Sequence, residues 1–267
     1  MNVIARNFFR LLRAGTFGTQ EQLEPLSAYK WKRLYQVAAI HHVAGIISRG
    51  LSLNHHQYFV GQAPSCPYQP AAHVDLLLTK QHLLDQRLSN PLLHHVMKDI
   101  ISSASQHDEP TLGLLLRLQL IASTTLTQGL PLRQLVELAV LLRSKGFHAN
   151  QELLSGWIGR LRLRRMAQLQ GALLIDLLAV GEDAIPFLQP GTPLPSTEAV
   201  ADELLELTIE HDDYQFTQGN DIFVHSVNSQ ALLWHVRHSA QYFRYYPSES
   251  LTSFFTSFAR SLQHIEE

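Results

Sequence analysis

The stretch TLGLLLRLQLIASTTL, residues Thr111–Leu126, decides the fold class of this chain. Leucine dominates it, proline is absent, and Arg117 and Gln119 interrupt its apolar run. Because the run is longer than a typical strand, it predicts a strongly apolar α-helix.

The segments on either side of this helix also have helical periodicity. Pro131 is expected to open the next helix in its first turn, and Gly146 is expected to end it. Before the apolar helix, QHDEP (Gln106–Pro110) reads as a polar turn. Further upstream, Asn90 and Pro91 divide the periodic pattern into two helices.

The pattern continues toward both ends of the chain. Ser27 is expected to cap a helix that stops at Gly50, and Asn150 a helix that runs to about Arg165. We expect at most one short extended piece, at Asp221–Val224, because no alternation of strands and helices is found. The predicted fold is therefore an all-α multi-helix bundle.

A proline-rich linker predicts the division of the chain. Four prolines fall within a short stretch, namely Pro186, Pro190, Pro193 and Pro195. We expect residues 1–188 to form the main bundle and residues 189–267 to form a C-terminal helical segment packed on it.

The composition of the chain disfavours nucleic acid and anionic membrane as partners. The net charge is -2 and the pI is about 6.7, so no global positive field attracts nucleic acid or anionic membrane. Charged residues make up 16% of the chain, below the roughly 25% of typical soluble proteins. With no apolar run of about 18 residues, we expect no membrane span and a cytoplasmic protein. A protein partner or self-association is the expected mode of interaction.

Three blocks of sequence resemble an uncharacterised nucleotidyltransferase-like family common in Bacteroidetes, and together they cover about half the chain. The blocks are FFRLLRAGTFG (Phe8–Gly18) followed by KWKRLYQVAAIHHVAGIISRGL (Lys30–Leu51); QGLPLRQLVELAVLL (Gln128–Leu142) leading into GRLRLRRMAQLQGALLIDLLAV (Gly159–Val180); and FRYYPSESLTSFFTSF (Phe243–Phe258).

The resemblance implies a catalytic core that this chain lacks. The family's core is a small mixed sheet whose Asp-x-Asp pair holds Mg²⁺ and a nucleotide triphosphate, because phosphoryl transfer depends on positioning and charge neutralisation. No Asp-x-Asp occurs here, and Glu210-His211-Asp212 is the nearest mimic. We expect that the core was lost near Gln106–Pro110, and that the chain is a non-catalytic binding or accessory protein with no cofactor and no metal site.

Four residues are candidate contacts for a ligand or partner. Arg133 and Glu137 are spaced i, i+4, which predicts an ion pair; the resemblance places Glu137 where the family has aspartate. Arg160 and Arg164 are expected to share one helical face. That face is either a solvated surface or a contact for phosphate, RNA or an acidic partner, although the composition disfavours nucleic acid.

The alternative is a nucleotidyl- or phosphoryl-transferring enzyme with a rearranged carboxylate–metal site. Its metal ligands would come from separate segments, with Asp108, Glu109, Glu210, Asp212 and Asp213 as the candidates. Among the 15 histidines the closest groupings are pairs, such as His41-His42 and His94-His95, which gives no complete set of zinc ligands.

Overall fold

The computed structural model describes residues 1–61, 63–74, 76, 79–189, 191–204, 240–253 and 255, and within them it contains helices and no strand. The all-α prediction is confirmed for this part of the chain, and Asp221–Val224 lies outside it. The helices are α1 (Val3–Phe17), α2 (Ala28–Ile40), α3 (Ala44–Leu53), α4 (Tyr58–Gly61), α5 (Lys80–Leu84), α6 (Pro91–Ser103), α7 (Glu109–Gln128), α8 (Leu132–Leu142), α9 (Gln151–Arg160) and α10 (Arg164–Leu178), with 3-10 turns η1 (Gln106–Asp108) and η2 (Glu182–Ala184). Residues 198–204 and 247–253 are also helical.

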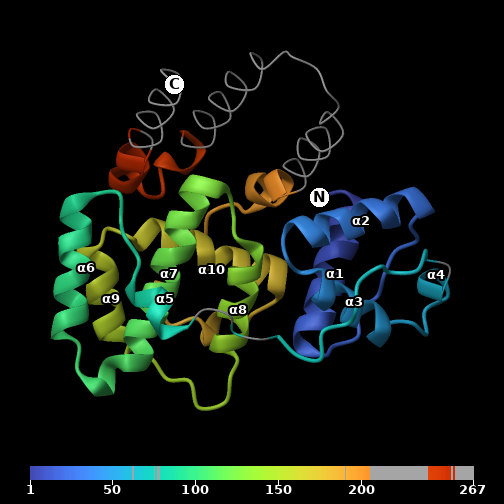
Figure 1. Ribbon diagram of the computed structural model, residues 1–267, viewed down its shortest axis with the longest axis horizontal. Helices are drawn as coiled ribbons and strands as arrows, with labels where there is room; N and C mark the ends of the chain where they lie inside the picture. The colour runs from blue at the N-terminus through green and yellow to red at the C-terminus, as the bar shows by residue number, and fades with distance from the viewer. Residues whose placement is uncertain are drawn as a thin grey trace.

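Helix α7 is the apolar helix predicted for Thr111–Leu126, and it lies in the core. Leu114, Leu115, Leu118 and Ile121 are fully buried. Figure 1 shows α1 to α4 on one side of the molecule and α5 to α10 on the other. Because α1 packs on α3 and also reaches α8 and α10, one continuous hydrophobic cluster joins the two sides.

The contact between α1 and α3 depends on two glycines. A Cβ atom on Gly15 would lie 1.9 Å from the carbonyl oxygen of Ile46, and one on Gly50 would lie 2.2 Å from that of Leu11. The prediction that Gly50 ends a helix is wrong, because Gly50 lies inside α3. Its lack of a side chain instead allows two helix backbones to touch.

Three of the helices that the structure describes end at a residue other than glycine in the left-handed conformation. These residues are His42 with φ 56°, Arg162 with φ 56° and Ala179 with φ 51°. After each, an apolar residue returns its N–H to a carbonyl group of the preceding helix. The separation is five residues for Val43 and Leu163, as in a Schellman motif, and six residues for Val180. The three apolar residues, Val43, Leu163 and Val180, are at most 1% exposed. Their burial therefore ends the helices without glycine.

Other predicted helix starts are confirmed. Ser27, Asn90 and Asn150 each accept a hydrogen bond from a backbone N–H in the first turn of the following helix. Pro131 comes directly before α8. Two predicted helix ends are wrong, because α8 ends at Leu142 rather than at Gly146, and α9 ends at Arg160 rather than near Arg165.

The described C-terminal residues pack on the bundle. Tyr246 is fully buried, and its hydroxyl donates to Oε1 of Gln119 in α7 at 3.1 Å. Glu249 accepts hydrogen bonds from the backbone N–H groups of Ser89 and Asn90, directly before α6. Figure 1 shows this segment beside the start of α6. Among the helices that the structure describes, none has the length and apolar character needed to cross a membrane.

Candidate functional site

Arg133 and Glu137 form the predicted ion pair. Nε of Arg133 lies 3.1 Å from Oε1 of Glu137, four residues later in α8. Arg117 of α7 adds a second cation, with Nη1 3.9 Å from Oε2 of Glu137. Glu137 is only 1% exposed, and burial lowers the pKa of Arg117. The three residues connect α7 and α8, which is a structural role.

Arg160 and Arg164 do not share a helical face, so that prediction is wrong. Arg160 ends α9, and Arg164 begins α10. Between them, Leu161 and Leu163 are fully buried and Arg162 takes the left-handed conformation. The chain therefore leaves the helix, and the two guanidinium groups lie at different places.

The turn sends the two arginines to opposite faces of α9. Arg160 lines a shallow groove with Leu153 and Trp157. Arg164 lines a separate cavity that Gln151 and Ser155 border from the other face.

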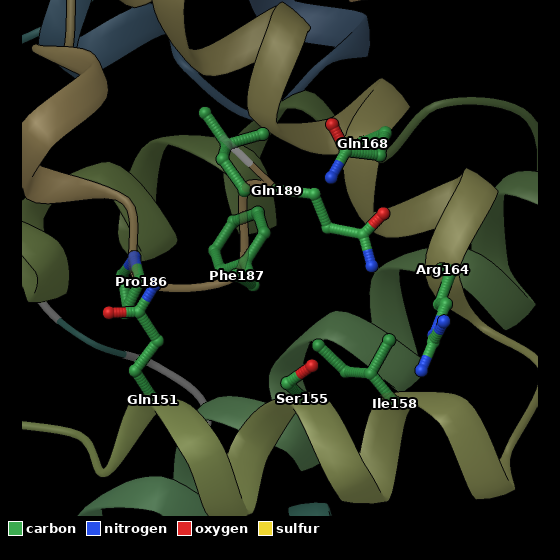
Figure 2. A pocket seen from close by; sticks show the side chains of 9 residues that line it. Gln151, Ser155, Ile158, Arg164, Gln168, Pro186, Phe187 and Gln189 are labelled. Carbon is green, nitrogen blue, oxygen red and sulfur yellow. The ribbon is translucent and has the colours of Figure 1, made fainter. Parts of the chain in front are cut away.

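The second of these spaces, the Arg164 cavity, is the candidate site. Its volume is about 100 Å³, and it lies between α9, α10 and the segment that follows η2. Figure 2 shows Arg164, Gln168 and Gln189 around one central space. The full lining is Gln151, Ser155, Ile158, Arg164, Gln168, Pro186, Phe187, Leu188 and Gln189.

Two glycines shape the cavity. A Cβ atom on Gly159 would lie 3.1 Å from Nη2 of Arg164, so the guanidinium group rests over this glycine. A Cβ atom on Gly171 would lie 2.4 Å from Cδ2 of Leu188. Because Gly171 allows Leu188 close to α10, the residues on either side of Leu188 form a wall of the cavity.

Two polar groups of the cavity lack partners among the described residues. Gln168 is 7% exposed, and its Oε1 atom is buried without a hydrogen-bond partner. Within the described part of the chain, no ion pair or hydrogen bond engages the guanidinium group of Arg164. None of the nine lining residues is a carboxylate. The first turn of α10 also contains no acidic residue, so the partial positive charge of the helix N-terminus adds to that of Arg164.

The carboxylates proposed for the alternative enzyme have other partners or lie outside the described residues. Asp108 accepts a hydrogen bond from the Ser105 hydroxyl at 2.7 Å, and Glu109 accepts one from Nζ of Lys80 at 2.7 Å. Glu210, Asp212 and Asp213 are not among the residues that the structure describes. Among those it does describe, no group of three or more His, Cys, Asp or Glu side chains is placed to hold a metal ion.

The sequence pattern indicates Arg164 as a candidate contact, but it does not indicate the polar neighbours of Arg164. Gln168 follows Arg164 by four residues on a largely apolar helix, and this spacing was a usable signal. Gln151 and Ser155 share a face of α9, which periodicity also shows. Gln189 lies in an irregular segment, and nothing in the sequence places it opposite Arg164.

No protein-family model, curated protein or solved structure matches this chain. The nucleotidyltransferase-like ancestry therefore stays an expectation that rests on the three sequence blocks.

Proposed function

We propose that this chain is a non-catalytic helical binding or accessory protein, derived from a nucleotidyltransferase-like ancestor that lost its metal-binding core. The observation that carries the proposal is the Arg164 cavity, which combines one cation, several neutral polar groups and no carboxylate. Such a lining holds a small group but supplies no carboxylate, histidine or cysteine as a metal ligand and no carboxylate base.

The size of the cavity supports the same function. At about 100 Å³ it is smaller than the roughly 300–1,000 Å³ of pockets that enclose drug-sized ligands. A nucleoside triphosphate does not fit inside it. The cavity suits a small molecule or a single group of a partner.

Calorimetric titration with ATP, CTP, GTP and UTP in the presence of Mg²⁺ tests the proposal. We expect no saturable, metal-dependent binding of any nucleotide. Saturable binding that requires Mg²⁺ and is weakened by Asp108→Asn or Glu109→Gln would favour the transferase alternative. Glu198→Gln, which removes an exposed negative charge elsewhere on the surface, is the control for general effects of surface charge.

A further inference from the structure

We infer that the Arg164 cavity recognises a carboxylate group carried on a short apolar body. This inference rests on the proposed binding function and names its ligand class. The same chemistry is available from a free short-chain acid and from the C-terminal residue of a polypeptide.

The charge of the lining favours a carboxylate over a phosphate. Arg164 is the only charged residue among the nine that line the cavity. One guanidinium group matches the single charge and two oxygens of a carboxylate in a bidentate pair. A phosphate carries close to two charges at neutral pH, and the neighbouring Arg165 donates instead to the carbonyl oxygen of Arg244.

The neutral polar groups complete the recognition. The buried Oε1 atom of Gln168 lacks a partner, which is costly for a polar atom removed from water. The same amide carries an N–H₂ group, so Gln168 can also present a donor to the ligand. Gln189 brings a second amide into the same space (Figure 2). Two amides beside one cation suit an anion whose oxygens accept several hydrogen bonds.

The rest of the wall sets the size of the ligand. Ile158 is 3% exposed and Phe187 is 5% exposed, and both face the cavity. The volume of about 100 Å³ is somewhat smaller than the roughly 150 Å³ of an engineered apolar cavity that binds benzene. An acid of about four or five carbons therefore fills the space, with its chain on the apolar wall and its carboxylate at Arg164.

The experiment follows the glutamine side-chain amide signals of the full-length ¹⁵N-labelled protein by NMR during titration with sodium butyrate. We expect saturable shifts with a Kd in the millimolar range, because a ligand of this size makes few contacts. Butyramide has the same shape without the charge, and we expect it to bind about tenfold more weakly or less. Inorganic phosphate is expected to bind similarly weakly.

Matched arginine variants locate the binding. Arg164→Gln should weaken butyrate binding about tenfold or more, and Arg164→Lys should weaken it less, because lysine keeps the charge but loses the bidentate geometry. Arg160→Gln, at the other end of the same turn, should leave binding unchanged. Both arginines are exposed, so we expect every variant to fold, which far-UV circular dichroism checks.

A tetrapeptide that ends in valine, with a free or an amidated C-terminus, distinguishes the two sources. Tighter binding of the free-acid peptide than of butyrate assigns the site to a polypeptide terminus, and the reverse assigns it to a free acid; both support the inference. Absence of butyrate binding, binding unaffected by Arg164→Gln, or equal binding of butyramide or phosphate would overturn it. Equal binding of phosphate through Arg164 would leave the proposed binding function standing, whereas Mg²⁺-dependent nucleotide binding contradicts that function separately.

Discussion

At the scale of single residues, three left-handed residues show how this chain ends helices where no glycine is present. An L-residue in that conformation costs about 1–2 kcal/mol relative to the right-handed one. Burial of the next apolar side chain, as at Leu163 (0% exposed), offsets that cost, since a fully buried leucine gains about 1.5–3 kcal/mol.

Arg162→Gly should therefore stabilise the protein. Arg162 is exposed with φ 56°, and glycine adopts this conformation without the steric cost of Cβ. We expect the free energy of unfolding to rise by about 0.5–1 kcal/mol, measured by urea denaturation. Arg160→Gly, in the last turn of α9, is the control and should lower it by about 0.5–1 kcal/mol. A less stable Arg162→Gly protein would contradict this account of the turn.

The buried carboxylate of Glu137 predicts a large loss of stability on removal. Glu137→Ala leaves Arg117 and Arg133 without the carboxylate that lies 3.9 Å and 3.1 Å from them. Breaking a buried pair from one side costs about 3–5 kcal/mol, and we expect a loss near the lower limit in chemical denaturation. The exposed Glu152→Ala on α9 should change stability by about 0.5 kcal/mol or less. If both variants lose equally little free energy of unfolding, the ion pair contributes no net stability.

At the scale of elements, the chain uses one connection twice. In α2–α3 and in α9–α10, a left-handed residue and a buried apolar residue join two short helices. In the first pair the glycines of α1 and α3 then bring helices together, and in the second the turn sends Arg164 into the cavity. The same local geometry thus serves packing in one place and the candidate site in the other.

Gly50→Ala should destabilise the contact between α1 and α3. Its new Cβ would lie 2.2 Å from the Leu11 carbonyl oxygen, and backbone atoms must move to relieve this contact. Overpacking of a core costs about 1–3 kcal/mol, which thermal denaturation will show as a lower Tm. Gly113→Ala in α7 meets nothing within 4 Å, and the greater helix propensity of alanine should make this control more stable by up to about 1 kcal/mol. An unchanged Tm for Gly50→Ala would mean that the two helices are not in close contact.

At the scale of the whole molecule, the C-terminal residues are held to the bundle by a buried carboxyl group. Glu249 is 2% exposed and accepts hydrogen bonds from the Ser89 and Asn90 backbone. Burial raises the pKa of Glu249 above the usual value for glutamate, although these hydrogen bonds oppose the shift. The stability of this docking therefore depends on pH.

The sign of that dependence follows from the raised pKa. The pKa of Glu249 is higher in the folded state than in the unfolded state. The carboxyl group therefore makes its full contribution to the free energy of unfolding below the unfolded pKa, and this contribution is lost as pH rises through the folded pKa. We expect the stability of the wild type relative to Glu249→Gln to decrease between about pH 4 and pH 7. Urea denaturation of both proteins across this range measures it, with the exposed Glu198→Gln as control. If the stability of the wild type relative to Glu249→Gln instead increases with pH, the fold favours the carboxylate rather than the neutral acid.

Much of this molecule could be predicted before its structure was known. The apolar run at Thr111–Leu126 predicted a strongly apolar helix, and the caps at Ser27 and Asn150 predicted where two helices begin. The break at Asn90 and Pro91 predicted the boundary before α6. These features are local, because a helix start depends on side chains within a few residues of it. The ion pair of Arg133 and Glu137 was predictable for the same reason, since i, i+4 residues meet on any helix.

The sequence by itself determined the helical class, most helix starts and the Arg133–Glu137 pair, because each depends on neighbours within one or two turns. Only the tertiary structure decided the helix ends at His42 and Arg162, since these depend on the burial of Val43 and Leu163 against distant parts of the chain. It alone decided the Arg164 cavity as well. Its wall at Phe187–Gln189 reaches Arg164 only because Leu188 packs at Gly171, a contact between segments that no local pattern specifies.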